Sequence, residues 1–406
     1  MELNKGQEKV FQQLQEFLAS DERFFSLESG GGYGKTFLLN HLESKIPELN
    51  KVRSLMHLPQ IGKMLYTATT NKAASLLGNN SSTIHKLFKI YPNTNYKTGV
   101  TTYKVGNTAD LYEELLVLDE SSMLDPKIFE IVESKIRGRA KVIFALDPYQ
   151  LAPIGHEAPI VNELVTTHNI PRGELTEPMR QDKDSHLFKV CNMLRDCVRK
   201  QVYTPIELGK GIRAVSATEF QAEYLAAFQA HEDVRIIALS NNQVESHNGY
   251  IRKTLYNIDR FQLGDPVVAA SAMDNVPEIK VEETYTIREI GKTLNDGHLD
   301  YYEVDLGLSQ WFKVPVNKQL YFKRLKAAQQ EGKSSGDWSV YYTLKANYLD
   351  IRDGFACTAH KAQGSTYDKV FLDFASLTQC PDINTFLRAL YVAVSRARYE
   401  VVIYGL

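Results

Sequence analysis

Short apolar runs alternate with amphipathic stretches along the first third of the chain. Phe24–Leu27, Met64–Thr67, Leu115–Leu118 and Lys141–Leu146 are mainly apolar and have the length of strands. Between Lys5 and Ala19 the apolar residues recur at helical spacing instead, which predicts an amphipathic helix. Buried apolar strands that alternate with helices are typical of a parallel sheet in an α/β fold.

A second α/β series is predicted in the later part of the chain. Arg235–Leu239 has the composition of a strand, and a helix is expected to follow it as far as Ile251. The pattern resumes with a strand at Val370–Phe374, a largely apolar helix at Leu387–Arg398 and a last strand at Val401–Tyr404. The chain therefore contains enough elements for two α/β domains.

Three segments depart from this alternation. Pro47 begins a polar stretch that we expect to be a connector. Tyr91–Val105 is polar and β-leaning, with a turn predicted at Lys97–Gly99, so it should form a projecting hairpin. Residues 255–348 alternate polar with β-branched or aromatic residues, which predicts a small all-β insertion, and Lys326–Trp338 should be a charged loop within it.

The composition of the 406 residues narrows the class of protein. The formal net charge of −2 offers no global attraction for nucleic acid, so any such contact must come from a local groove. The four cysteines form no C-x-x-C pair, which argues against a zinc site or a disulfide framework. No apolar run is long enough to span a bilayer and no secretory leader is evident, so we expect a cytoplasmic protein without membrane contact.

A glycine-rich loop between a strand and a helix is the strongest local signal. Its glycines let backbone N–H groups turn toward an anion, and the following helix points its positive end at the same place. Lys35 can reach the β- and γ-phosphates of a nucleotide, and the Thr36 hydroxyl can bind Mg²⁺. Ser29 stands where the motif has a glycine; the alternative is a glycine-rich turn with an unrelated lysine. The candidate loop residues are Gly30, Gly31, Gly32, Tyr33, Gly34, Lys35 and Thr36.

Polar residues follow two of the predicted strands. Asp119 and Glu120 end the apolar run at Leu115, where Asp119 can hold Mg²⁺ and Glu120 can polarise an attacking water. Gln150 lies just beyond the next strand, at the edge where ligands bind in open α/β sheets. An acidic pair after a strand is common by chance, but it is much less so downstream of a phosphate-binding loop.

Several residues allow two interpretations from the sequence alone. Gln7 could read an adenine edge, although a solvated glutamine is favoured for it in isolation. Arg396 could be a surface arginine or an arginine finger on a phosphate, and Arg180 is available for a phosphate as well. Thr70 and Ser82 lie where they could help to hold DNA phosphates, yet ordinary helix capping is favoured for both.

These blocks, in this order, resemble the motif series of superfamily 1 DNA helicases, in particular the 5′→3′ branch with the phage Dda and RecD-like enzymes. Thr358–Ser365 and Tyr391–Arg398 are the most specific blocks, and the resemblance covers nearly the whole chain. Three residues depart from the family pattern, namely Ser29 for a glycine, Thr69 for a proline and Leu146 for a glycine.

The resemblance assigns roles to individual residues. It implies that the nucleotide site also includes Gln7 and Gly364, and that Thr36 and Asp119 bind the metal. Pro92 in the hairpin, with Trp338 and Tyr342 in the insertion, are further DNA candidates, although packing is an equal alternative for the last two. The implied catalytic residues are Lys35, Asp119, Glu120, Gln150, Arg180 and Arg396. The implied single-stranded DNA contacts are Thr70, Asn71, Thr83, His85, Thr358, His360 and Lys361.

The resemblance also implies a domain plan. One RecA-like P-loop domain would span residues 1–175, with a hairpin pin at about 86–108, and a second would join 176–254 to 349–406. Residues 255–348 would be an SH3-like insertion in the second domain. ATP and Mg²⁺ would be the cofactors and single-stranded or forked DNA the substrate. A single-strand-binding or replisome protein is a further candidate partner of a monomeric enzyme in a bacterial or phage-infected cytoplasm.

Two rival functions remain open at this point. A P-loop kinase for a small molecule would turn over ATP regardless of DNA, but it leaves the Thr358 and Arg396 blocks unexplained. A DNA-binding scaffold gated by ATP would bind without turnover, which Glu120 argues against. The ATPase rate with and without a single-stranded oligonucleotide separates all three functions.

Overall fold

The chain forms two compact units. The computed structural model describes residues 3–406 except 79–80, 95–100, 154, 178–184, 259, 272, 274–275 and 277. Met1–Ala217 and Ala362–Leu406 make up the first unit, and Thr218–Lys361 the second. The division into two RecA-like domains and an insertion at the boundaries expected above stays a prediction.

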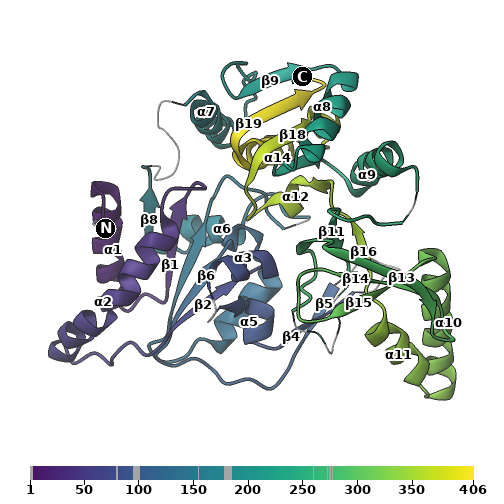
Figure 1. Cartoon of the computed structure of the whole chain (residues 1–406). Coiled ribbons are helices and arrows are strands. Elements are labelled where there is room, and N and C mark those ends of the chain that lie inside the picture. The colour runs from purple at the N-terminus through teal and green to yellow at the C-terminus, as the bar shows by residue number, and fades with distance from the viewer. Residues whose placement is uncertain are drawn as a thin grey trace. The chain divides into compact units, whose positions relative to one another are not determined.

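The first unit contains a six-stranded parallel sheet in the order β3-β2-β6-β7-β1-β8 (Figure 1). All four strands predicted in this part of the chain are confirmed. The strands are β1 (Phe24–Ser29), β2 (Met64–Ala68), β3 (Ser82–Thr83), β6 (Leu115–Asp119), β7 (Lys141–Leu146) and β8 (Arg172–Leu175). The helices are α1 (Lys5–Ala19), α2 (Lys35–Leu55), α3 (Asn71–Leu76), α4 (Ile84–Leu87), α5 (Pro126–Lys135) and α6 (Ile160–Thr167), with a 3-10 turn at Ser121–Met123.

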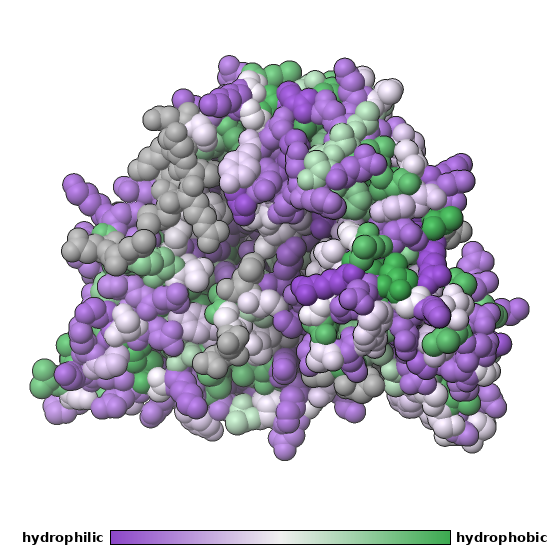
Figure 2. Space-filling view, in the orientation of Figure 1, coloured by the Kyte–Doolittle hydropathy of each residue, from purple (hydrophilic) through white to green (hydrophobic). Residues whose placement is uncertain are grey.

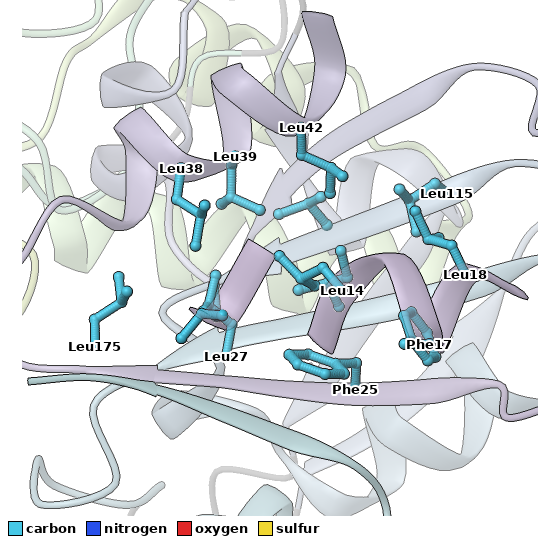
Figure 3. Packing of buried hydrophobic residues seen from close by; sticks show 14 of the residues in the cluster. Leu14, Phe17, Leu18, Phe25, Leu27, Leu38, Leu39, Leu42, Leu115 and Leu175 are labelled. Carbon is cyan, nitrogen blue, oxygen red and sulfur yellow. The ribbon is translucent and has the colours of Figure 1, made fainter. Parts of the chain in front are cut away.

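Both faces of the sheet are buried at β6, which explains why Leu115–Leu118 are all apolar. Leu115 and Val117 of β6 lie in one hydrophobic cluster with residues of α1 and α2, while Leu116 and Leu118 lie in a second cluster with α5 and α6. Figure 3 shows side chains of the first cluster, where Leu14 of α1 lies near Phe25 and Leu27 of β1. Alternate residues of a strand point to opposite faces, so a two-sided core requires a continuous apolar run.

The connector predicted from Pro47 is wrong, because α2 continues through this proline to Leu55. The last turns of the helix are held by tertiary contacts of Arg53, which is buried. Its Nε donates to the carbonyl of Pro59 at 2.9 Å and its Nη1 donates to that of Leu18. These contacts offset the backbone hydrogen bond that a proline cannot make.

The first unit also contains a second group of elements, which come from residues 186–215 and 367–404. Strands β18, β19 and β9 are parallel, and α7 packs against α14. The predicted helix and strands of the C-terminal segment are thus confirmed. The elements are α7 (His186–Lys200), β9 (Ile212–Val215), β18 (Tyr367–Asp373), α13 (Phe374–Leu377), α14 (Ile383–Ser395) and β19 (Ala397–Tyr404).

The second unit combines a parallel strand pair with antiparallel sheets. Strands β10 and β17 are parallel, whereas β12-β11-β16 and β13-β14-β15 are antiparallel three-stranded sheets. The helices are α8 (Ala217–Gln229), α9 (Asn241–Tyr256), α10 (Lys318–Ser335), α11 (Ser339–Asn347) and α12 (Ala359–Ala362), the first and last of which cross the unit boundary. The strands are β10 (Val234–Ala238), β11 (Pro266–Ala269), β12 (Thr284–Thr286), β13 (Glu289–Asn295), β14 (Asp300–Asp305), β15 (Trp311–Pro315), β16 (Ile351–Asp353) and β17 (Ala356–Thr358).

The insertion is not all-β as predicted, and the expected loop at Lys326–Trp338 is largely helical. Asn317 caps the start of α10 through its side chain, and Gly336 ends it in the left-handed conformation. Tyr321 and Ala328 of α10 are buried in a cluster that includes Leu344 of α11. This helix carries few apolar residues, so its stability depends on the tertiary packing of one narrow face.

A hairpin is present where one was predicted. Strands β4 (Ile90–Thr94) and β5 (Thr101–Val105) pair antiparallel, and the predicted turn at Lys97–Gly99 lies outside the described residues. Tyr103 ties the hairpin to the sheet unit, because its hydroxyl donates to Asp125 Oδ2 at 3.2 Å and its ring lies 6.2 Å from that of His85. The role of the hairpin as a pin stays a prediction.

The visible face of the molecule in Figure 2 is mostly hydrophilic, with smaller hydrophobic areas among the polar residues. Among the helices that the structure describes, none combines the length and the apolar composition needed to cross a bilayer.

Candidate nucleotide and DNA-binding site

The glycine-rich loop joins β1 to α2 in a conformation that requires glycine. Gly32 and Gly34 have φ angles of 82° and 85°, in the left-handed region that other residues avoid. A Cβ on Gly30 would come within 2.7 Å of the Tyr33 ring. Ser29, the departure from the motif, is accommodated as the last residue of β1, where its hydroxyl donates to the carbonyl of Gly30 at 3.2 Å.

The carboxylates after β6 face this loop. Nζ of Lys35 lies 3.6 Å from Oδ1 of Asp119. Burial opposes the charge of Lys35, but the carboxylates of Asp119 and Glu120 outweigh it and raise the lysine pKa. Lys35 therefore stays protonated and can exchange Asp119 for a phosphate as its partner.

Glu120 follows Asp119 and has one carboxylate oxygen without a hydrogen-bond partner among the described residues. Its backbone is left-handed, with φ 51°, and its Oε2 atom is buried without a hydrogen-bond partner in the described part of the chain. Burial raises the pKa of this carboxyl against the opposing charges of Lys35 and Arg396. A buried oxygen without a partner is costly, so it marks a place where a polar ligand or a water is expected.

Arg396 is brought to the loop from the far end of the sequence. It caps the C-terminal end of α14 and is only 5% exposed, so the surface-arginine interpretation is wrong. Nη1 donates to the carbonyl of Ser365 at 3.3 Å and Nη2 to Ser395 Oγ at 2.8 Å. Nη2 would be 3.8 Å from a Cβ on Gly31, which places the guanidinium beside the phosphate loop.

Gln150 is buried in the loop that follows β7. Its Oε1 accepts a 3.2 Å hydrogen bond from Nε2 of Gln363, which also donates to the carbonyl of Leu151 at 3.2 Å. Leu146, a departure from the family pattern, is a buried core residue at the end of β7.

These residues line one pocket of about 570 Å³. Gly364 belongs to it with φ 70°, and a Cβ there would lie 3.8 Å from Oε1 of Glu120. The pocket brings together most of the predicted nucleotide-site residues: Gly30, Gly31, Gly32, Tyr33, Gly34, Lys35, Thr36, Asp119, Glu120, Gln150, Gly364 and Arg396. Further lining residues, which were not among the predicted site residues, are Phe37, Lys72, Ala73, Leu77, Ser365, Thr366 and Arg398.

Gln7 is not among the residues that line this pocket. Gln7 is 1% exposed, so the solvated interpretation is wrong. Its Oε1 accepts from the backbone of Asn4 at 3.1 Å and its Nε2 donates to the carbonyl of Gly34 at 3.5 Å, which links α1 to the phosphate loop. Its role in reading adenine stays a prediction. Arg180 lies outside the described residues.

Sequence reasoning missed Arg195 on α7. Its guanidinium carbon lies 5.4 Å from the Tyr33 ring and 4.8 Å from the Tyr149 ring, and its Nη1 donates to the Tyr33 hydroxyl at 3.3 Å. The same hydroxyl donates to Asn192 at 3.1 Å. One cation therefore holds the phosphate loop and the loop before Gln150 together. The 3.6-residue period of α7 gives no sign of this contact.

The metal candidates fit a hard cation. Thr36 and Asp119 both line the pocket and offer oxygen donors, which Mg²⁺ prefers. No three His, Cys, Asp or Glu side chains converge on one point in the described part of the chain. A magnesium ion here would therefore draw its other ligands from phosphate and water, as Mg²⁺ usually does.

The predicted DNA residues of the first unit lie at the carboxyl edge of the same sheet. Strand β2 places Ala68 level with both Asp119 of β6 and Thr83 of β3. Thr70 caps α3, as predicted, by accepting from the N–H of Ala73 at 3.2 Å. The predicted cap at Ser82 is wrong.

The residue that caps α4 is Thr83, because Ser82 belongs to β3. Thr83 accepts from the N–H of Lys86 at 3.2 Å. Asn71 begins α3, and His85 lies half-buried in α4, where burial lowers its pKa. Burial therefore favours a neutral His85.

Some of the predicted DNA contacts in the second unit are buried and others are exposed. Thr358 is buried and its Oγ1 accepts from the N–H of Lys361 at 3.3 Å, while the Lys361 ammonium lies 3.3 Å from Glu282. His360 is half-buried beside them. Trp338 covers Gly332 of α10, which supports the packing alternative for this residue.

Tyr342 is 57% exposed and open to a partner. The side chain of Pro92 lies outside what the structure describes, although its backbone is part of β4.

Two family models match the chain. Residues 2–207 match the model of an AAA domain, which covers just over half of the chain, and residues 353–404 match that of the UvrD-like helicase C-terminal domain. The chain belongs to the superfamily 1 DNA helicases. This helicase is 24% identical to the ATP-dependent DNA helicase dda of Enterobacteria phage T4, over 98% of either chain.

Solved helicase structures share the fold. The Pif1 helicase from Bacteroides in complex with ADP-AlF3 and single-stranded DNA superposes with a TM-score of 0.57 at 19% identity, over 100% of this chain and 93% of that one. A Pif1 structure described for DNA unwinding at forked double-stranded DNA gives 0.55 at 17% identity, over 99% and 92%. This similarity supports an α/β fold with two RecA-like domains. As a member of its family, the protein is an ATP-dependent DNA helicase.

Proposed function

We propose that this helicase moves 5′→3′ along single-stranded DNA and separates the duplex ahead of it. The observation that carries the proposal is the convergence of Lys35, Glu120 and Arg396 on one pocket, where Glu120 Oε2 has no partner among the described residues. A cation for phosphate, a free carboxylate oxygen and a second cation are the groups that phosphoryl transfer to water requires. The polarity is proposed from the branch of the family that the chain resembles.

In this proposal each group of pocket residues has its own role in ATP binding or hydrolysis. The backbone N–H groups of the phosphate loop and Lys35 hold the β- and γ-phosphates. Thr36 and Asp119 would hold Mg²⁺, which neutralises the phosphate charge when bound. Glu120 accepts a hydrogen bond from the attacking water and orients it. Arg396 stabilises the charge that develops on the γ-phosphate.

Three further residues complete the proposed nucleotide site. Gln150 would detect the γ-phosphate from the loop after β7, to which the buried Gln363 is hydrogen-bonded. Arg180 would contact the same phosphate. Gln7 would read the adenine edge, which requires its amide to exchange the contact with Gly34 for one with the base.

In this proposal the DNA strand moves because two DNA-binding regions, called grips here, hold it alternately as ATP is bound and hydrolysed. We place one grip at Thr70, Asn71, Thr83 and His85, and the other at Thr358, His360 and Lys361. Hydroxyl, amide and lysine groups suit the DNA backbone, and the exposed ring of Tyr342 can stack on a base. Loss of the γ-phosphate removes its bridge between Lys35 and Arg396 and resets the cycle.

The domain plan and the biological setting belong to the same proposal. Residues 1–175 would form the first RecA-like domain, residues 176–254 with 349–406 the second, and residues 255–348 an SH3-like insertion. The enzyme would act as a cytoplasmic monomer on forked DNA, together with a single-strand-binding or replisome protein. In keeping with this, a Pif1 relative has been described at forked double-stranded DNA.

Unwinding of tailed duplexes tests the proposal. Two substrates share one duplex and differ only in carrying a 5′ or a 3′ single-stranded tail. We expect ATP-dependent strand separation from the 5′-tailed substrate alone, ATPase stimulation by the single-stranded oligonucleotide, and neither activity in a Lys35→Ala variant. Unwinding from the 3′ tail alone would reverse the polarity. Turnover that ignores DNA would favour a small-molecule kinase.

A further inference from the structure

Thr69 connects a proposed DNA contact to the proposed catalytic acid. Strand β2 ends at Ala68, which lies level with Asp119 in the parallel sheet. The residues that follow, Thr69 and Glu120, are therefore neighbours at the carboxyl edge. The Thr69 hydroxyl donates a hydrogen bond of 3.1 Å to the backbone carbonyl of Glu120.

This hydrogen bond is one of three that hold the backbone of Glu120. The Glu120 N–H donates to Asp119 Oδ1 at 2.9 Å, and the Glu120 carbonyl also accepts from the N–H of Met123 at 3.1 Å. The backbone needs such support because φ of Glu120 is 51°, a conformation that L-residues with a side chain rarely adopt.

The position of the Glu120 carboxylate depends on this backbone. Glu120 lines the pocket, and in the described part of the chain no hydrogen-bond donor contacts its Oε2 atom, so the backbone rather than a hydrogen bond from a second side chain sets the position of that oxygen. A small rotation of the Glu120 peptide would move the carboxylate, and general-base catalysis is sensitive to such displacement.

The three residues after Thr69 include an exposed residue, Thr70, and a residue that lines the pocket, Lys72. Thr70 is exposed, and with Asn71 it belongs to the proposed DNA grip. The ammonium of Lys72 lies 5.6 Å from the ring of Tyr367, whose N–H donates to the carbonyl of Arg396 at 2.9 Å. Of these four consecutive residues, Thr69 contacts Glu120 and Lys72 contacts the segment of Arg396 through Tyr367, while Thr70 and Asn71 are the proposed DNA contacts.

We infer that Thr69 is a positioning residue that sets the geometry of Glu120 and carries DNA contact at Thr70 and Asn71 to it. The inference rests on the proposed function, because it assumes that Glu120 orients the water and that α3 contacts DNA. It adds a route for DNA stimulation of the ATPase that depends on one hydroxyl group.

The test compares Thr69→Val, which removes the hydroxyl at nearly constant shape, with Thr69→Ser, which keeps it. For each variant, kcat and KM for ATP are measured with and without saturating oligonucleotide, and the oligonucleotide Kd is measured by fluorescence anisotropy. We expect the valine variant to lose roughly 3- to 10-fold in DNA-stimulated kcat, the range for one neutral hydrogen bond. In the valine variant, KM for ATP and Kd for the oligonucleotide should stay within about twofold of wild type, and the ratio of stimulated to unstimulated kcat should fall. The serine variant should recover most of the rate.

Thr166→Val is the matched control, because its exposed hydroxyl donates to carbonyls of its own helix. A Thr69→Ser and Thr69→Ala pair, which also differs by one hydroxyl, gives the same comparison if valine prevents folding. If DNA stimulates the wild-type enzyme and the valine variant has the wild-type kcat, the role of Thr69 is overturned while the proposed function stands. An equal loss with and without DNA would overturn the coupling. A wild-type enzyme that DNA does not stimulate would overturn the proposed function as well.

Discussion

The hydroxyl of Tyr391 donates a 2.5 Å hydrogen bond to Oδ2 of Asp147, and both residues are buried. Burial, together with the negative charge of Asp147, raises the pKa of Tyr391 well above its usual range, so the hydroxyl remains a donor. Arg388 of the same helix donates to the carbonyls of Pro148 and Gln150 at 2.8 and 2.7 Å. The helix that carries Arg396 is therefore fastened to the loop that carries Gln150.

Removing the Tyr391 hydroxyl should destabilise the first unit. Tyr391→Phe leaves an oxygen of buried Asp147 without its donor, and we expect the free energy of unfolding to fall by about 1–3 kcal/mol. Urea denaturation measures this loss. Tyr399→Phe is the control, since that ring is 66% exposed and its hydroxyl should matter little. Equal stability of the two variants would show that the Tyr391–Asp147 bond contributes nothing.

Replacing the proposed catalytic acid should separate binding from hydrolysis. Glu120→Gln keeps the shape of the side chain but removes the charge that orients water, so kcat should fall by about 10²-fold or more while ATP and DNA still bind. Steady-state ATPase assays and oligonucleotide titrations measure the two effects. Glu130→Gln is the control, because Glu130 lies on the exposed face of α5. Near-wild-type turnover in Glu120→Gln would remove this residue from the mechanism.

The acidic limb of the pH profile should report Glu120. The carboxylate form is the active one, and burial raises its pKa above the ordinary value of 4.5. As pH falls, kcat/KM for ATP should therefore decline through a pKa higher than 4.5, because this ratio reports the free enzyme. The Glu120→Gln variant should lack this limb. A limb at or below the ordinary value in the wild type would contradict the assignment.

Arg396 should act on the transition state more than on ATP binding. Arg396→Ala removes the cation beside Gly31, and DNA-stimulated kcat should fall roughly 10³-fold, by analogy with arginine fingers. The Kd for ATP should change little. Arg199→Ala is the matched control, because that exposed arginine pairs with Asp196 on its own helix. DNA stimulation that survives in Arg396→Ala would rule out this role.

The hairpin should be needed for unwinding but not for translocation. Opening each base-pair step costs roughly 1–2 kcal/mol of stacking, which calls for a rigid wedge at the fork. Replacing Asn93–Thr102 with a short Gly-Ser linker, while keeping the anchoring Tyr103, should preserve DNA-stimulated ATPase and single-strand translocation and abolish strand separation. Unwinding of forked duplex at the wild-type rate would show that the segment is only a connection.

The sequence by itself determined those features that depend on a short run of neighbouring residues. The phosphate loop was predictable because left-handed turns need glycines at Gly32 and Gly34, and the loop stands between an apolar strand and a helix. Four of the six strands of the first sheet were predictable because their runs are mainly apolar, whereas the short or alternating β3 and β8 gave no such signal. The acidic pair after β6 followed from the same pattern.

Other features were decided only by the tertiary structure. Helix α2 continues past Pro47 because Arg53 finds carbonyl partners at Leu18 and Pro59, and α10 forms because its narrow apolar face packs against α11. The burial of Gln7 and Arg396 depends on elements remote in sequence, and so does the position of Arg195 between Tyr33 and Tyr149. Spacing along the chain sets backbone conformation, but the partner of a side chain is chosen by packing between distant segments, as with Thr69 and Glu120.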